Sequence, residues 1–210
     1  MILTIFVIFI FIGVTEIAFR RIGFTRLQAI LLLVGTFVGS SVNLPLMRIK
    51  GLERIVQMQE VRFFWMTYRI PHVALEEVST LVAVNLGGAI IPTCASIYLL
   101  YNHPDQLTVA FLGVVFTAII VHMFARKLPG LGIATPAFVP PIVAALGAYV
   151  LSPGSPNTLA YVAGTLGTLI GADLTNLRHI GQLGAPVVSI GGAGTFDGVF
   201  LSGIIAALLV

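Results

Sequence analysis

The chain has 210 residues, of which 58% are hydrophobic and 9% are charged, and its formal net charge is +3. A soluble domain carries about 25% charged residues, so this composition excludes a soluble globular protein. The small positive charge is not a signal of nucleic-acid binding, since it reflects basic residues at membrane boundaries. The single cysteine, Cys94, excludes an internal disulfide.

Seven apolar segments, each near the ~20 residues that span a bilayer, follow one another along the chain. They are 2–19, 28–47, 78–101, 107–125, 132–151, 158–177 and 185–210. The first lacks the basic region and cleavage site of a signal peptide, so we expect it to be retained as a transmembrane helix. The pattern predicts an all-α integral membrane protein with a single transmembrane domain over residues 1–210. We expect six to seven transmembrane helices, at least one of them interrupted or re-entrant.

The one long polar stretch, residues 48–77, lies between the second and third apolar segments. Apolar residues such as Val56, Met58 and Trp65 are interrupted there by charges, and Pro71 would end a helix. We expect an interfacial amphipathic helix on the membrane surface. The alternative is a short polar loop domain.

Basic residues predict the orientation, because cytoplasmic loops carry most of the lysine and arginine. If all seven segments span the membrane, eight of the eleven basic residues lie on one side, and Arg20, Arg21 and Arg26 lie on the other. If segment 28–47 is re-entrant, all eleven lie on the cytoplasmic side. In both cases we expect the protein to lie in the cytoplasmic membrane of a prokaryote.

Two aspartates inside apolar segments, Asp173 and Asp197, are the candidate catalytic residues. An ionised carboxylate is costly in hydrocarbon, so a carboxylate at that depth usually has a task. If the two meet, they share one proton, and one activates water as a general base while the other donates a proton. In the structural alternative, Asp173 pairs with Arg178 or His179, and Asp197 accepts bonds from the backbone amides of a glycine run.

Three further features suggest substrate binding. Prolines crowd the start of segment 132–151, so this backbone is expected either to line a cavity or to begin a helix. Two asparagines at lipid depth would bond across helices or coordinate a substrate or an ion. Small residues before the second aspartate would let the backbone of an extended substrate approach the carboxylate. The candidate substrate-binding residues are Pro136, Ala137, Phe138, Gly194, Asn43 and Asn85.

A basic group ends the segment 107–125, where His122 and Arg126 are one helical turn apart and Lys127 follows. These residues suggest a site for a substrate anion or a lipid headgroup, or ordinary interfacial anchors. The remaining histidines are scattered without metal-ligand spacing, so we predict no metal and no other cofactor.

The aspartates and the proline-rich segment resemble the intramembrane aspartic proteases, the presenilin and signal-peptide-peptidase group. That group carries one aspartate on each of two neighbouring helices, one within Gly-x-Gly-Asp, and a Pro-Ala-Leu motif beside them. The corresponding segments here are 194–197 and 136–138, although the latter precedes the aspartates and its counterpart in the family follows them. The resemblance implies that Asp173 and Asp197 form the catalytic dyad. More globally, the chain is similar to small prokaryotic membrane proteins of unknown function, which implies no activity.

These observations predict a membrane-embedded aspartic-type hydrolase that cuts a peptide bond within the bilayer. Its partners would be the lipid bilayer and a membrane-protein or peptide substrate. Two alternatives stay open. One is a proton- or cation-coupled transporter or channel that uses the same aspartates. The other is a non-catalytic scaffold or sensor with residues 48–77 as its partner-binding surface.

Overall fold

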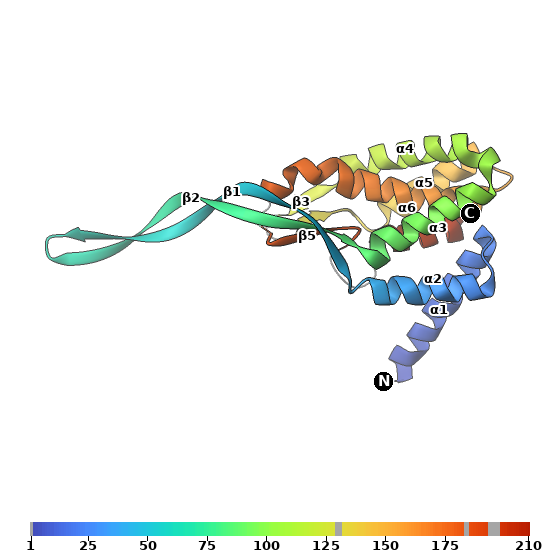
Figure 1. The fold of residues 1–210 in the computed structure, drawn as a ribbon, viewed down its shortest axis with the longest axis horizontal. Coiled ribbons are helices and arrows are strands. Elements are labelled where there is room, and N and C mark those ends of the chain that lie inside the picture. The colour runs from blue at the N-terminus through green and yellow to red at the C-terminus, as the bar shows by residue number, and fades with distance from the viewer. Residues whose placement is uncertain (1, 129–131, 183–184, 193–197) are drawn as a thin grey trace.

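The computed structural model describes residues 2–128, 132–182, 185–192 and 198–210, which form two parts (Figure 1). One part is a helical body that contains both ends of the chain. The other is a long two-stranded β ribbon that extends from one end of the body, roughly along the direction of its helices.

The helical body is built around α6, which is buried on all sides. Every residue from Thr158 to Thr165 of this helix is buried, because α1, α3, α4, α5 and α7 all contact it. The ring of Tyr161 lies 5.9 Å from that of Phe19, which lies 6.2 Å from Phe200. The α-helices are α1 (Ile2–Ile22), α2 (Arg26–Gly39), α3 (Ile91–Asn102), α4 (Leu107–Phe124), α5 (Val139–Leu151), α6 (Pro156–Thr168) and α7 (Gly198–Leu209).

Shorter helical turns extend these helices. A π-helical turn, η1 (Leu86–Ile90), leads into α3, and a second, η3 (Leu169–Asp173), continues α6. The 3₁₀ turns η2 (Pro104–Gln106) and η4 (Leu174–Gln182) precede α4 and follow η3. A π-helical turn inserts an extra residue and re-aims the side chains after it, and such turns are frequent at functional sites.

Small residues allow α4, α6 and α7 to pack closely. A Cβ atom added at Gly167 would lie 2.6 Å from the Cβ of Thr117 in α4. One added at Gly203 of α7 would lie 2.2 Å from the Oγ1 of Thr165 in α6. Both helix pairs therefore depend on the absence of a side chain at the contact.

The ribbon consists of β1 (Asn43–Phe63) and β2 (Met66–Asn85), which are antiparallel and paired from Asn43↔Asn85 to Phe63↔Met66. Phe64 and Trp65 join them with φ values of 47° and 67°. Two positive φ values in a two-residue loop are the signature of a type I′ hairpin turn. A short strand, β5 (Val187–Ile190), pairs in parallel with the base of β2, and β3 (Arg126–Leu128) pairs with β4 (Gly132–Ala134).

The predicted all-α fold with six to seven transmembrane helices is therefore wrong. The stretch 48–77 is the distal part of the ribbon, not an interfacial helix, and segments 78–101 and 185–210 begin as strands. In the described ranges one helix, Pro104–Phe124, is long and apolar enough to cross a membrane. The apolar helices Arg26–Gly39, Leu86–Asn102, Val139–Leu151 and Gly198–Leu209 are shorter. The predicted spans joined different elements into single apolar runs; segment 78–101, for example, contains the end of β2, all of η1 and most of α3.

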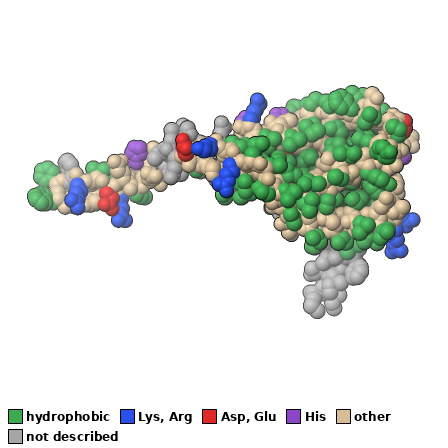
Figure 2. All heavy atoms as spheres, in the orientation of Figure 1, with side chains coloured by type: hydrophobic (Ala, Val, Ile, Leu, Met, Phe, Trp, Pro, Cys, Tyr) green, Lys and Arg blue, Asp and Glu red, His purple; other side chains and the backbone are tan. Residues whose placement is uncertain are grey.

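Basic residues lie at both ends of the helical body and along the ribbon (Figure 2). At the ribbon end, α2, α4 and η3 stop and the ribbon begins. At the far end, Thr158 Oγ1 donates to the carbonyl of Ile22 at 3.3 Å, and Asn157 donates to Ala207 at 3.1 Å. The ribbon and the ribbon end carry Arg48, Lys50, Arg54, Arg62, Arg69, Arg126, Lys127 and Arg178, and the far end carries Arg20, Arg21 and Arg26.

Candidate functional site

Asp173 is the last residue of η3 and lies at the ribbon end, beyond the apolar helix α6. Its Oδ2 atom accepts a hydrogen bond of 2.7 Å from the backbone N–H of Gly191. Gly191 directly follows β5. The contact therefore joins the end of the central helix to the end of the strand that pairs with the ribbon.

Gly191 is confined between Asp173 and η1. Its φ is +79°, a conformation that residues with a side chain rarely adopt. A Cβ atom there would lie 2.5 Å from the Cβ of Ala89 and 2.7 Å from its backbone nitrogen. Because Ala89 belongs to η1 and Asp173 to η3, both π-helical turns lie against this one glycine.

The surroundings of Asp173 change its acidity. Burial raises the pKa of its carboxyl group to about 6, although the hydrogen bond from Gly191 acts to lower it. Desolvation disfavours the charged form, and a single backbone donor only partly compensates. A carboxyl group with this pKa exchanges protons near neutral pH, as general acid–base chemistry requires.

The predicted structural role of Asp173 as an ion-pair partner is absent from the described part of the chain. Ion pairs there join Arg26 to Glu16 at 3.1 Å and Arg69 to Glu60 at 3.0 Å. Neither involves Asp173. Its partner is a backbone amide, which leaves the charge of the carboxylate unbalanced.

The second predicted catalytic residue, Asp197, lies outside the described residues, as does Gly194. The residues on either side of that segment are described. Ile190 and Val199 belong to the same apolar cluster as Leu169 of η3 and Ala89 of η1. The described residues just before and just after this segment therefore both pack beside η3.

Asn43 and Asn85 lie together as the first pair of the ribbon. Asn85 Nδ2 donates to Asn43 Oδ1 at 3.0 Å and to the carbonyl of Ser40 at 2.7 Å. Its Oδ1 accepts from the N–H of Gly88 at 2.7 Å, and the hydroxyl of Ser189 donates to Asn43 Oδ1 at 2.6 Å. The two amides thus hold α2, η1, β5 and the ribbon together, and Asn85 has no free amide group for a substrate in this arrangement.

Pro136, Ala137 and Phe138 form an exposed turn between β4 and α5. The N–H of Val139 donates to the carbonyl of Pro136 at 3.1 Å, and the next two prolines occupy the first turn of α5. Proline suits that position because its missing N–H has no partner there. Within the described ranges, no hydrogen bond joins this turn to Asp173.

Gly191, Thr175 and Asn176 were not predicted as site residues, whereas their neighbour His122 was singled out in the sequence. His122 Nδ1 lies 2.7 Å from Thr175 Oγ1, and Asn176 donates to the carbonyl of Ala172 at 2.9 Å. The role of Gly191 has one sequence signal, since Gly191-Gly192 follows a short run rich in β-branched residues. Thr175 and Asn176 carry no such signal.

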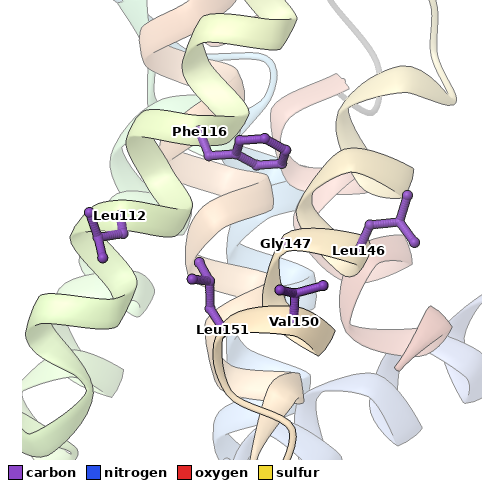
Figure 3. Close-up of a pocket in the computed structure, with 6 residues that line it drawn as sticks. All are labelled: Leu112, Phe116, Leu146, Gly147, Val150 and Leu151. Carbon is purple, nitrogen blue, oxygen red and sulfur yellow. The ribbon is translucent and has the colours of Figure 1, made fainter.

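Two surface hollows among the described residues are apolar. One, of about 400 Å³, lies between α4 and α5, and its lining includes Leu112, Phe116 and Leu146 (Figure 3). Another, of about 350 Å³, lies between α4 and η3 and ends at His122 and Thr175. Asp173 lines neither of them. Among the described residues, no three His, Cys, Asp or Glu side chains lie together in a way that would hold a metal.

Comparison with known proteins places the chain in one family. It belongs to the family described as "Protein of unknown function (DUF1614)", which matches residues 37–209. No curated protein and no solved structure matches the chain. The match covers the ribbon, the central helix and both aspartates.

Proposed function

We propose that this member of a family of unknown function is a membrane-embedded hydrolase in which Asp173 carries the acid–base chemistry. The observation that supports this most is the contact between Asp173 and Gly191. One carboxylate oxygen is held by the backbone, so the other keeps a fixed direction. A positioned carboxyl group that exchanges protons near neutral pH is what general acid–base catalysis needs.

Asp197 is proposed as the second carboxyl group. The residues flanking its segment pack beside η3, in the same cluster as Leu169. Two neighbouring carboxyl groups share one proton, so Asp173 would take a proton from water while its protonated partner donates one to the leaving group. The water oxygen would bond to the scissile carbonyl carbon as its proton passes to Asp173, and the carbon–nitrogen bond would then break so that the protonated amine leaves.

A peptide is the proposed substrate class. β5 is the last strand of the order β1-β2-β5, so its outer edge has no partner strand in the described part of the chain. An extended peptide that paired with this edge would place its backbone beside the end of β5, where Gly191 contacts Asp173. The edge strand therefore supports a peptide over a compact small molecule.

We also propose that the helical body lies in the cytoplasmic membrane. Apolar side chains cover the body (Figure 2), and Phe111 of α4, Ile119 of α4 and Val150 of α5 are 67%, 56% and 76% exposed. Apolar surface on this scale is unfavourable in water. The excess of basic residues on the ribbon and ribbon end supports a cytoplasmic ribbon, with α4 as the membrane-spanning helix.

Comparison of membrane-protein termini between cells tests this function without a known substrate. Cells producing the wild-type chain should yield new peptide termini within membrane proteins, and cells producing Asp173→Asn should not. Asp105→Asn is the matched control, since Asp105 is exposed in η2 at the far end. Identical termini with wild type and Asp173→Asn would refute the proposal, and proton flux without cleavage would favour transport.

A further inference from the structure

Four basic side chains from three elements gather at the ribbon end. His122 lies near the end of α4, Lys127 lies in β3, and Arg178 and His179 lie in η4. Burial of the imidazole of His179, and then the charges of Lys127, Arg178 and His122, lower its pKa. The 2.7 Å contact between His122 Nδ1 and Thr175 Oγ1 also places the end of α4 against η4, which carries Arg178 and His179.

The cluster has no acidic partner among the described residues. The ion pairs found there involve Glu16 and Glu60, and the carboxyl group of Asp173 is directed to Gly191. The Nδ1 atom of His179 is buried, and no described residue forms a hydrogen bond with it. The positive charges of Lys127 and Arg178 fit an anion, and several donors fit the oxygens of a phosphate group.

An apolar groove leads directly to this cluster. It has a volume of about 350 Å³ and is lined by one stripe of α4, which includes Val115 and Ile119, and by Ile170 of η3. Its polar end is formed by His122 and Thr175, whose side chains lie 2.7 Å apart. An apolar channel that ends in basic and hydroxyl groups has the shape and polarity of one phospholipid chain with its headgroup.

We propose that this groove binds one anionic phospholipid, with an acyl chain between α4 and η3 and its phosphate at His122, Lys127 and Arg178. The groove favours a lipid over free phosphate, because inorganic phosphate would leave the apolar surface uncovered. The site requires the proposed position of the body in the bilayer. It does not require hydrolase activity, so it stands if Asp173→Asn leaves cleavage unchanged.

Native mass spectrometry of the full chain in mild detergent tests the headgroup part of the site. Phosphatidylglycerol and phosphatidylcholine with the same acyl chains are titrated separately, and the wild-type chain should bind phosphatidylglycerol more tightly. The double variant Lys127→Gln/Arg178→Gln should bind it roughly thirtyfold more weakly, since each basic residue near an anionic headgroup contributes about fivefold. Arg20→Gln/Arg21→Gln removes the same charge at the far end and should bind as the wild type does.

A second pair of variants tests the acyl-chain part. Ile119→Trp fills this groove, and Leu146→Trp adds the same bulk to the groove between α4 and α5, which has no basic end. Only Ile119→Trp should weaken binding of phosphatidylglycerol. Unchanged binding in Ile119→Trp, together with displacement of the lipid by excess inorganic phosphate, would show a free-phosphate site and overturn the proposal.

Full retention of phosphatidylglycerol binding in the double glutamine variant would also overturn it. Lys127 and Arg178 are both exposed, so the melting temperature of this variant should equal that of Arg20→Gln/Arg21→Gln. If the double variant does not fold, the single Arg178→Gln variant carries the same test with an expected loss of about fivefold.

Discussion

Gly191 donates its backbone N–H to Asp173 Oδ2 at 2.7 Å, and its own α-carbon faces Ala89 of η1. This single residue therefore connects the π-helical turn at the end of α6 to the one that begins α3. The position of the carboxyl group depends on a backbone conformation that only glycine adopts easily, with φ at +79°.

Substituting alanine for Gly191 should destabilise the protein by at least about 2 kcal/mol. The left-handed backbone costs roughly 1–2 kcal/mol with a side chain, and the new Cβ would lie 2.5 Å from that of Ala89. The melting temperature in detergent should fall by roughly 4–8 °C. Gly154→Ala is the matched control, because a Cβ there meets nothing within 4 Å. Equal melting temperatures for the two variants would contradict the packing described for Gly191.

Asp173→Asn should change how stability depends on pH. Because the pKa is raised from 3.8 to about 6, the folded carboxyl group keeps its proton after the unfolded one has lost it. The raised pKa therefore stabilises the folded wild type below pH 3.8, and this stabilisation is lost as the pH rises to about 6. The change amounts to at most about 3 kcal/mol.

Asparagine does not titrate. The stability of Asp173→Asn relative to the wild type, measured as unfolding free energy, should therefore be highest above pH 6, and this advantage should fade below pH 3.8. Thermal unfolding of both chains across this range measures the difference. If unfolding free energy depended on pH in the same way for both chains, Asp173 would have the same pKa in the folded and unfolded chain.

Asn85→Ala should loosen the base of the ribbon. The substitution leaves the N–H of Gly88 and the carbonyl of Ser40 without their side-chain partners, and each unpaired buried group costs about 1–3 kcal/mol. We expect a loss of about 3 kcal/mol in unfolding free energy. Asn102→Ala removes one exposed bond to the carbonyl of Tyr98 and should cost less than about 0.5 kcal/mol. A similar loss in both variants would argue against a structural role for Asn85.

Replacing the turn Phe64-Trp65 by Asn-Gly should stabilise the ribbon. Both positions have positive φ, which asparagine and glycine tolerate far better than aromatic residues. Amide hydrogen exchange in β1 and β2 near the turn should slow by about fivefold, which corresponds to roughly 1 kcal/mol. Faster exchange in the variant would mean that the aromatic side chains hold the turn.

The helical part of the fold could be predicted from the sequence far better than the ribbon could. The segment 107–125 matches α4 (Leu107–Phe124), and 158–177 contains most of α6 and all of η3. The ribbon was missed because most of it lacks a buried face, so its apolar residues do not alternate regularly. Its turn also lacks the Asn-Gly or Asp-Gly pair that marks a hairpin.

The candidate site could be predicted only in part. Asp173 stood out because a carboxylate among apolar residues is costly. Its partner Gly191 acts through the backbone, which leaves no side-chain signal, and β5 is too short to be distinguished from the start of a helix. Asn43 and Asn85 were identified as polar groups at lipid depth, but their pairing follows from the register of the ribbon.

The most direct test of the account is cleavage by the purified chain in liposomes, using the membrane protein whose termini change in cells. Asp173→Asn should lower the cleavage rate by at least about a hundredfold, as expected for a lost general acid–base group. Asp105→Asn should cleave at the wild-type rate. Wild-type cleavage by Asp173→Asn, in a chain that folds normally, would contradict the central claim that Asp173 carries the chemistry.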